Sequence, residues 1–405
     1  MPHQTIVFHA LLKQIPWATF DRLVEQFDRN RDERAIKSKA HLLAMLLGQF
    51  CGARSLREIE ANLKSHAGKL YHLGGCTISK SVLSTANASD AAAAVFGGLL
   101  SVLMKQLQAG YRRKKASECI RLIDSTSVQL SGLSGDWATF STGVCGAKAH
   151  IVYDPDADQP LYLMVTPSNV NDITAAKEMP IEAGATYVFD LGYYDYLWWS
   201  MLDQAGCRIV TRLKANTPFE AVEDCPVPMG SSILSDRTGY LPKRQAAARR
   251  NPMSGLVREV RVVIETGKVL RIFTNDLTTS AQEIADLYKR RWAIELFFRW
   301  VKQTLKISHF LGTSEVAIRI QITIALIAFL LLRLAHDAHR IVASQLTFAR
   351  LIRTNLMQRR AITELLQSVP PPPPDQPGFD FDPATTRTAQ RRRRVRAPLA
   401  LARAA

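Results

Sequence analysis

The chain has 405 residues, of which 47% are hydrophobic and 22% charged, a composition that excludes an intrinsically disordered protein. Its 52 Lys and Arg residues outnumber 36 Asp and Glu residues, giving a formal charge of +16. This charge favours a polyanionic partner, chiefly nucleic acid, although an ordinary basic protein remains the alternative.

The sequence predicts a protein with no membrane partner, located in the cytoplasm and associated with the nucleoid. The N-terminus lacks a signal-peptide layout, and the most apolar run, residues 322–332, is too short to span a bilayer and is expected to be a buried helix. Six dispersed cysteines without a Cys-x-x-Cys pair argue against a zinc site and are typical of reduced thiols.

Residues 1–108 are predicted to form an all-α N-terminal domain, because apolar side chains recur there at helical spacing. Ser55 and Glu58 form a capping-box pattern, a Gly-Gly turn follows at 74–75, and a further helix is expected from Ser79. This arrangement suggests a helix-turn-helix that reads DNA, although the turn is longer than usual. The alternative is a helical cap on the next domain.

A basic run at residues 112–115 marks a boundary, and a second domain is expected over residues 118–345. Its predicted strands cover residues 120–130, 147–153, 160–166, 186–190 and 208–213, and its predicted short helices cover 173–179 and 196–204. Elements in this order indicate an α/β fold, a mixed sheet with helices on its faces.

Residues 215–280 interrupt this pattern and are predicted to be a small β insertion, with strands at 256–265 and 269–273. Two long helices are then expected, at 281–306 and 314–343. Residues 346–405 form a C-terminal extension whose Pro-rich and Arg-rich tail, from about residue 369, is predicted to be disordered. Its run of arginines is typical of a solvated tail, with a non-specific DNA arm as the alternative.

Two aspartates occupy apolar strand surroundings. Asp124 lies in the first strand of the expected sheet, and Asp190 closes the strand TYVFD. A carboxylate in such a position costs free energy unless it is paired or binds a metal. For Asp190, capping of the next helix is the alternative.

A third acid, Glu295, lies on a helix whose polar face is rich in cations. Helical geometry places Tyr288, Arg291, Glu295, Arg299 and Lys302 within an arc of roughly 80°, and the apolar face is formed by Ile294, Phe297, Phe298 and Val301. A salt-bridged surface stripe is the alternative, but this stripe carries more positive charge than one acid can pair. Three carboxylates in this setting are typical of phosphoryl transfer with two Mg²⁺ ions, for which Mn²⁺ is an expected substitute.

The spacing Tyr288-x2-Arg291-x3-Glu295-x6-Lys302 resembles the Tyr-Arg-Glu-Lys signature of DDE transposases of bacterial insertion sequences, in the subgroup named after insertion sequence four. The stretches LIDSTSV, TPSNVND, VFDLGYYDY and IVTRLKANT resemble the same family, so that the resemblance covers about residues 118–340. The helical N-terminal domain looks like one that often precedes this catalytic domain.

The resemblance implies a ribonuclease-H-like fold with a β insertion before the third acid, and a metal site formed by Asp124, Asp190 and Glu295. It also implies that Tyr288, Arg291 and Lys302 contact the phosphates of the transposon end, and that Tyr288 and Arg291 support strand distortion if the reaction passes through a DNA hairpin. The expected activity is binding of terminal inverted repeats, cleavage at the element ends and joining of the 3′ ends to target DNA. The expected partners are double-stranded DNA and, in the DNA complex, a second copy of the chain. The alternatives are a ribonuclease-H-like nuclease without strand transfer and a non-catalytic DNA-binding derivative.

Other polar residues are weaker candidates. Arg299 shares the helix face but lies outside the signature, and Arg212 and Lys214 leave a strand near the expected site, where phosphate contacts are plausible. Lys148 and His150 are interpreted as a satisfied polar strand face, and the cluster Asn169, Asn171 and Asp172 as turn chemistry. A nucleotide cofactor is not expected, because the sequence contains neither a Walker loop nor a dinucleotide-binding glycine motif.

Overall fold

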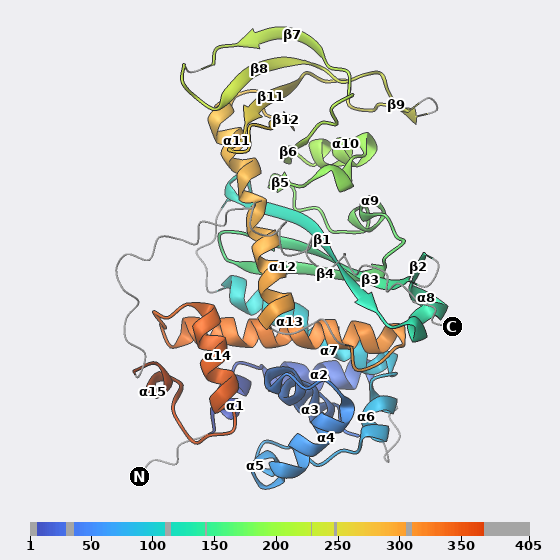
Figure 1. The fold of residues 1–405 in the computed structure, drawn as a ribbon, viewed down its shortest axis with the longest axis vertical. Coiled ribbons are helices and arrows are strands. Elements are labelled where there is room, and N and C mark those ends of the chain that lie inside the picture. The colour runs from blue at the N-terminus through green and yellow to red at the C-terminus, as the bar shows by residue number, and fades with distance from the viewer. Residues whose placement is uncertain are drawn as a thin grey trace, which may run out of the picture.

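The computed structural model describes residues 6–29, 36–109, 115–141, 144–227, 229–246, 249–304 and 310–367. The predictions for the tail from residue 369 and for most of the basic run at 112–115 lie outside the described residues. The molecule is elongated, with the N-terminal helices at one end, the β insertion at the other and the central sheet between them (Figure 1).

The N-terminal region is helical, as the sequence predicts. Its helices are α1 (Val7–Leu12), α2 (Trp17–Phe27), α3 (Ser38–Cys51), α4 (Leu56–Ser65), α5 (Ala67–Tyr71), α6 (Lys80–Ala86) and α7 (Asp90–Ala109). The predicted cap is present, since the Ser55 side chain accepts a hydrogen bond from the Glu58 N–H. Between the two helices considered for DNA reading, α4 and α6, the short helix α5 intervenes.

The central sheet has the strand order of a ribonuclease-H-like fold. Its first strands are β1 (Ile120–Leu130), β2 (Thr139–Ser141), β3 (Val144–Asp154), β4 (Gln159–Pro167), β5 (Thr186–Val188) and β6 (Arg208–Arg212). β3 is antiparallel to β1 and β4, whereas β5 is parallel to both β1 and β6. The mixed α/β fold is therefore confirmed.

The insertion extends this sheet. Its strands are β7 (Glu220–Cys225), β8 (Ile233–Tyr240), β9 (Arg244–Ala246), β10 (Arg249–Arg250), β11 (Val257–Val263) and β12 (Val269–Thr274). β12 pairs with β6, and β11, β8 and β7 follow in order, while β9 and β10 form a separate pair. The turn between β11 and β12 requires Gly267, whose φ of 76° is in the left-handed region.

The two faces of the sheet are covered by different helices. On β1, Ile123 packs in a cluster with Trp198 and Trp199 of α10 (Tyr196–Gln204), as part of the face that also lies near α9 (Asp172–Ala176). The neighbouring Leu122 belongs to the other cluster, together with Phe297 of α12 (Trp292–Thr304). Since successive strand residues point to opposite faces, Asp124 lies on the α12 face.

The prediction of a single helix over residues 281–306 is wrong in one respect. The chain forms α11 (Ala281–Arg290) and α12, with a tighter turn at Arg291. The Arg291 N–H donates to the Tyr288 carbonyl and the Ile294 N–H to the Arg291 carbonyl, both bonds spanning three residues. Such a 3₁₀-type turn interrupts the regular α-helical ladder. The predicted apolar face is confirmed, since Ile294, Phe297, Phe298 and Val301 are all buried.

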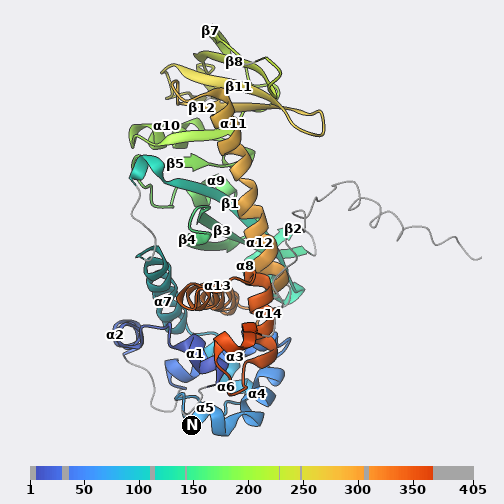
Figure 2. The same ribbon diagram turned by 90° about the vertical axis from the view of Figure 1, so that its left-hand side faces the viewer.

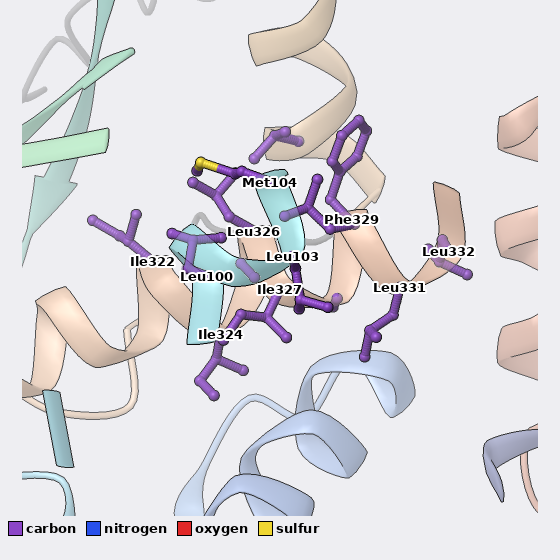
Figure 3. Packing of buried hydrophobic residues seen from close by; sticks show 14 of the residues in the cluster. Leu100, Leu103, Met104, Ile322, Ile324, Leu326, Ile327, Phe329, Leu331 and Leu332 are labelled. Carbon is purple, nitrogen blue, oxygen red and sulfur yellow. The ribbon is translucent and has the colours of Figure 1, made fainter. Parts of the chain in front are cut away.

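The apolar helix predicted over 314–343 is α13 (Glu315–Ala338), which ends earlier because Arg340 has a φ of 48°. It lies between the sheet and the N-terminal helices and packs on α7 and α3 (Figure 2). α7 and α13 have the length and apolar composition of membrane-spanning helices, but 78% of the most apolar window of α13 is buried inside the protein. Figure 3 shows Leu103 and Met104 of α7 beside Leu326 and Ile327 of α13. The C-terminal helices α14 (Gln345–Asn355) and α15 (Ile362–Gln367) complete this layer.

Candidate active site

The first and third predicted acids meet at one arginine. Asp124 comes from the middle of β1 and Glu295 from the first turn of α12. Arg291 Nη1 lies 3.4 Å from Asp124 Oδ2, and Arg291 Nη2 lies 2.5 Å from Glu295 Oε1. The packing of α12 on β1 thus joins residues 167 positions apart in the sequence.

The second predicted acid lies just beyond β5, the neighbour of β1. The strand ends at Val188, two residues earlier than predicted, and Asp190 caps the 3₁₀ turn Leu191–Tyr193. Its Oδ1 accepts a hydrogen bond of 2.8 Å from the Gly192 N–H. The helix-capping alternative for Asp190 therefore describes one of its contacts, and it leaves the second carboxylate oxygen for other ligands.

The electrostatics of the site raise the pKa of Asp124 to about 6. Burial is the largest cause, and the negative charges of Asp190 and Glu295 act in the same direction, so both of these acids lie within electrostatic reach of Asp124. A hydrogen bond from the Ser125 N–H and the charge of Arg291 oppose this rise in pKa. A carboxyl group with these neighbours is stabilised in its charged form by any additional cation.

Tyr288 lies between two arginines at the edge of the acids. Its ring centroid is 6.0 Å from the guanidinium carbon of Arg291 and 5.9 Å from that of Arg212. The ring is buried, and this burial raises the pKa of its hydroxyl. Among the described residues, neither Arg212 Nε nor Arg291 Nε has a hydrogen-bond partner, although both atoms are buried. These two buried N–H groups, each part of a positively charged guanidinium, could therefore donate hydrogen bonds to an anionic acceptor.

The remaining predicted contacts lie at three different places. Lys302 donates to the Ser127 carbonyl of β1 over 2.9 Å, and burial lowers its pKa. Arg299 lies 5.9 Å from the ring of Trp292, which is 50% exposed. Lys214 lies 4.7 Å from the Tyr194 ring, in the loop that follows β6. Lys302 thus contacts the backbone of β1, whereas Arg299 and Lys214 contact aromatic rings.

The sequence interpretation missed a group of residues that contacts the neighbours of Asp124 rather than Asp124 itself. Asp172, assigned to turn chemistry, accepts hydrogen bonds from the Ser125 hydroxyl over 2.8 Å and from Lys148 over 3.1 Å. A Cβ added to Gly192 would lie 3.0 Å from Asp172 and 3.0 Å from Asp190. Asp172 therefore lies next to Ser125 and Gly192, the two residues whose N–H groups bond Asp124 and Asp190. Lys148 and His150, predicted to be a satisfied polar face, alternate on β3 opposite Ser127 and Ser125, a signal that becomes visible only with the strand register.

The donor set fits a hard divalent cation, because carboxylate oxygens are the ligands that Mg²⁺ and Mn²⁺ prefer. Within the described parts of the chain, no three acidic, histidine or cysteine side chains already lie at metal-binding separation. The guanidinium of Arg291 lies instead between Asp124 and Glu295, where it provides a positive charge.

Comparison with protein families decides the identity of this domain. Residues 115–331, more than half of the chain, match the model of the transposase DDE domain. The chain belongs to the DDE transposase family. Residues 3–76 match a domain of unknown function, DUF4372. The predicted family, with its helical N-terminal region, is thereby confirmed.

Two relatives that are named as transposases agree with this assignment. The transposase is 38% identical over 288 residues to y4zB of Sinorhizobium fredii, a protein named as a transposase, covering 70% of this chain and 78% of that protein. It is 28% identical over 242 residues to a protein of Geobacillus stearothermophilus named as a transposase of insertion sequence element IS5377, covering 59% and 63% of the two chains. A solved piggyBac transposase in a synaptic complex with hairpin DNA aligns over 94% of this chain and 89% of its own, with 9% identity and a TM-score of 0.44.

Membership of the family establishes the activity in general terms. The transposase is an enzyme of DNA cleavage and strand transfer, depends on divalent metal and has DNA as its partner. As a transposase of the insertion-sequence type, it acts on DNA in the cytoplasm.

Proposed function

We propose that the transposase binds the terminal inverted repeats of its element, cleaves the phosphodiester bond at each element end and joins the 3′ ends to target DNA. The observation that carries this proposal is the convergence of Asp124 and Glu295 on Arg291, with Asp190 in electrostatic reach. Carboxylates from a central strand, its neighbour and a covering helix form one acidic site on the α12 face.

In the proposed site Asp124, Asp190 and Glu295 hold two Mg²⁺ ions, for which Mn²⁺ substitutes. When bound, these ions activate the attacking water or 3′-hydroxyl and stabilise the leaving oxygen. Ser125 and Gly192 orient the two aspartates through their backbone N–H groups. Burial of Asp124 keeps bulk water from screening its charge.

The proposed DNA contacts are the cations and the aromatic group that border the acids, namely Tyr288, Arg291, Lys302, Arg299, Arg212 and Lys214. A groove supports this proposal, because Arg212, Tyr288, Arg291 and Trp292 line it together with the β11–β12 hairpin. Cations grip backbone phosphates, whereas aromatic rings stack on exposed bases. This lining is therefore suited to a distorted strand near the cleaved bond.

We assign recognition of the repeat sequence to the N-terminal domain, residues 1–108, and catalysis to residues 118–345, with residues 215–280 as its insertion. Two copies are required in the DNA complex because two ends are joined. The same affinity for DNA implies association with the nucleoid. Deletion of residues 1–108 is a poor test, since α7 and α3 cover the apolar surface of α13.

Arg57 and Lys80 offer a better test of recognition, because both are exposed on α4 and α6. Arg57→Gln with Lys80→Gln should reduce discrimination between repeat DNA and random DNA while leaving the thermal stability nearly unchanged. Unchanged discrimination would remove recognition from this face.

The test of the activity uses labelled DNA that carries the inverted repeat flanking the gene, incubated with Mg²⁺ or Mn²⁺. Asp124→Asn, Asp190→Asn and Glu295→Gln should each bind this DNA but fail to cleave it, whereas Glu178→Gln, a change at an exposed acid of the opposite sheet face, should cleave normally. Cleavage that persists in any of the three variants would show that this acid was wrongly chosen. Cleavage without joining would favour a nuclease, and binding without cleavage by the unaltered protein would favour a non-catalytic derivative.

A further inference from the structure

Arg291 takes the place that a metal ion would need. Its guanidinium contacts Asp124 Oδ2 and Glu295 Oε1 at 3.4 and 2.5 Å, and its side chain is only 16% exposed. We propose that Arg291 is an internal counter-cation, which holds the acids together in the free protein and leaves when transposon-end DNA binds. Metal loading would then be coupled to DNA binding. This inference rests on the proposed metal site.

The first step of the argument is that the two cations compete. A divalent ion held by Asp124 and Glu295 uses the carboxylate oxygens that Arg291 contacts now. Both cations would also lie in a partly buried site, where like charges repel more strongly than in water. The acids therefore bind either the guanidinium or the metal ion well, and the presence of Arg291 weakens metal binding in the free protein.

The second step is that a destination for Arg291 exists next to its present position. The groove that contains Arg291 is also lined by Arg212, Lys268, Lys289 and the exposed Trp292. Its four cations outnumber its two acidic residues, Glu265 and Asp286, so that the net charge of the lining is positive and attracts a phosphate. The fork of an arginine binds phosphate through two parallel hydrogen bonds. Arg291 Nε, which is buried and has no acceptor among the described residues, would gain one there.

The third step is local freedom of the backbone. Arg291 lies at the tight turn between α11 and α12, where bonds spanning three residues replace the regular ladder. Such a turn in the middle of a helix is a common place for a hinge. Arg291 can therefore change its direction without unwinding the helix that carries Glu295.

The test measures Mn²⁺ binding to the full chain without DNA, by titration calorimetry or by the electron paramagnetic resonance of free Mn²⁺. Arg291→Gln should bind Mn²⁺ about tenfold more tightly than the unaltered protein, because the competing charge is gone. Arg291→Lys, which keeps the charge, should stay near the unaltered affinity. Arg350→Gln removes the same charge at an exposed position of α14 and is the matched control. A gain of affinity is a result that structural damage does not produce.

The coupling is measured by repeating the titration with duplex DNA ending in the flanking inverted repeat. This DNA should tighten Mn²⁺ binding by the unaltered protein about tenfold, because binding of DNA and binding of metal favour each other to the same extent. It should tighten Mn²⁺ binding by Arg291→Gln much less, because this variant has no guanidinium for the DNA to draw away. Equal tightening in both proteins would overturn the coupling to DNA.

Asp124→Ala separates this inference from the proposed function. If Asp124→Ala weakens Mn²⁺ binding but Arg291→Gln binds no more tightly than the unaltered protein, the metal site stands and the counter-cation is wrong. If Asp124→Ala leaves Mn²⁺ binding unchanged, the proposed metal site itself fails, and the role of Arg291 fails with it. Circular dichroism of each variant confirms that its fold is intact.

Discussion

The hydroxyl of Ser125 donates a hydrogen bond of 2.8 Å to Asp172, although the two residues are 47 positions apart in the sequence. The backbone N–H of the same serine donates to Asp124 over 2.8 Å. Asp172 therefore reaches the proposed metal ligand through one intermediate residue, and it also accepts from Lys148. Residues in this position orient the ligands of metal sites and tune their affinity.

Substitution of Asp172 should impair cleavage more than DNA binding. We expect Asp172→Ala to lower the cleavage rate by about tenfold or more, because the Ser125 support of Asp124 is lost. Asp172→Asn keeps an acceptor for Ser125 and should retain more activity. Rates measured at saturating DNA, with DNA binding measured separately, decide the matter. Equal activity of Asp172→Ala and the unaltered protein would mean that Asp172 has only a structural role.

Protonation of His150 should destabilise the protein in mild acid, and the raised pKa of Asp124 opposes this effect, because protonation of that carboxyl stabilises the fold as the pH falls below 6. Burial lowers the pKa of this fully buried imidazole from 6.5 to about 4; Asp172 opposes the decrease and Lys148 adds to it. Since the unfolded chain takes up the proton first, the stabilisation is complete above pH 6.5 and is lost as the pH falls from 6.5 towards 4. The loss should be on the order of 3 kcal/mol.

Urea unfolding at several pH values measures this loss. His150→Gln, which can still pair with Thr166, should remove the His150 contribution, so that the unfolding free energy at pH 4 relative to pH 6.5 is higher in the variant than in the unaltered protein. His72→Gln, at an exposed histidine, is the control. An unchanged slope in His150→Gln would assign the acid sensitivity to other groups.

The insertion should depend on Glu259, which is fully buried in β11. Its carboxylate pairs with Arg237, Arg261 and Arg271, and Arg271 also donates to the carbonyls of Lys214, Ala215 and Thr217, each at 2.9 Å. Removal of one partner from a buried ion pair leaves uncompensated charge.

We expect Glu259→Gln to lower the free energy of unfolding by about 3 kcal/mol and to loosen the loop that carries Lys214. Chemical denaturation measures the first effect, and hydrogen exchange of residues 214–217 measures the second. Glu265→Gln, in the exposed turn between β11 and β12, is the matched control. Unchanged exchange in the loop would contradict the link through Arg271.

The cations at the end of β6 and just after it should contribute to the salt dependence of DNA binding. Arg212→Ala and Lys214→Ala should each reduce the slope of log affinity against log salt by about one, because each removes one phosphate contact. Lys105→Ala, at an exposed position of α7, should leave the slope unchanged. Fluorescence anisotropy measured at salt concentrations from about 50 to 200 mM gives the slopes. Equal slopes for all variants would place the DNA elsewhere.

The sequence by itself determined the family, the types of the main elements and the faces of the signature helix. The family follows from the resemblance of short motifs. The element types and helix faces are local features, because periods of two and of about 3.6 residues report burial directly. Phe297 and Phe298 are buried for this reason, and Glu295 lies on the other side of the same helix. The predicted strand positions of β1, β3 and β4 follow from the same rule.

Only the tertiary structure decided which side chains meet. The register that places Ser125 opposite His150, and the packing that brings Arg291 to Asp124 across 167 positions, depend on how separate elements pair. Asp172 looked like a turn residue because its partners lie on strands distant in the sequence. Likewise, the insertion strands continue the central sheet because β12 bonds to the free edge of β6, a pairing made by backbone groups that no side-chain pattern specifies.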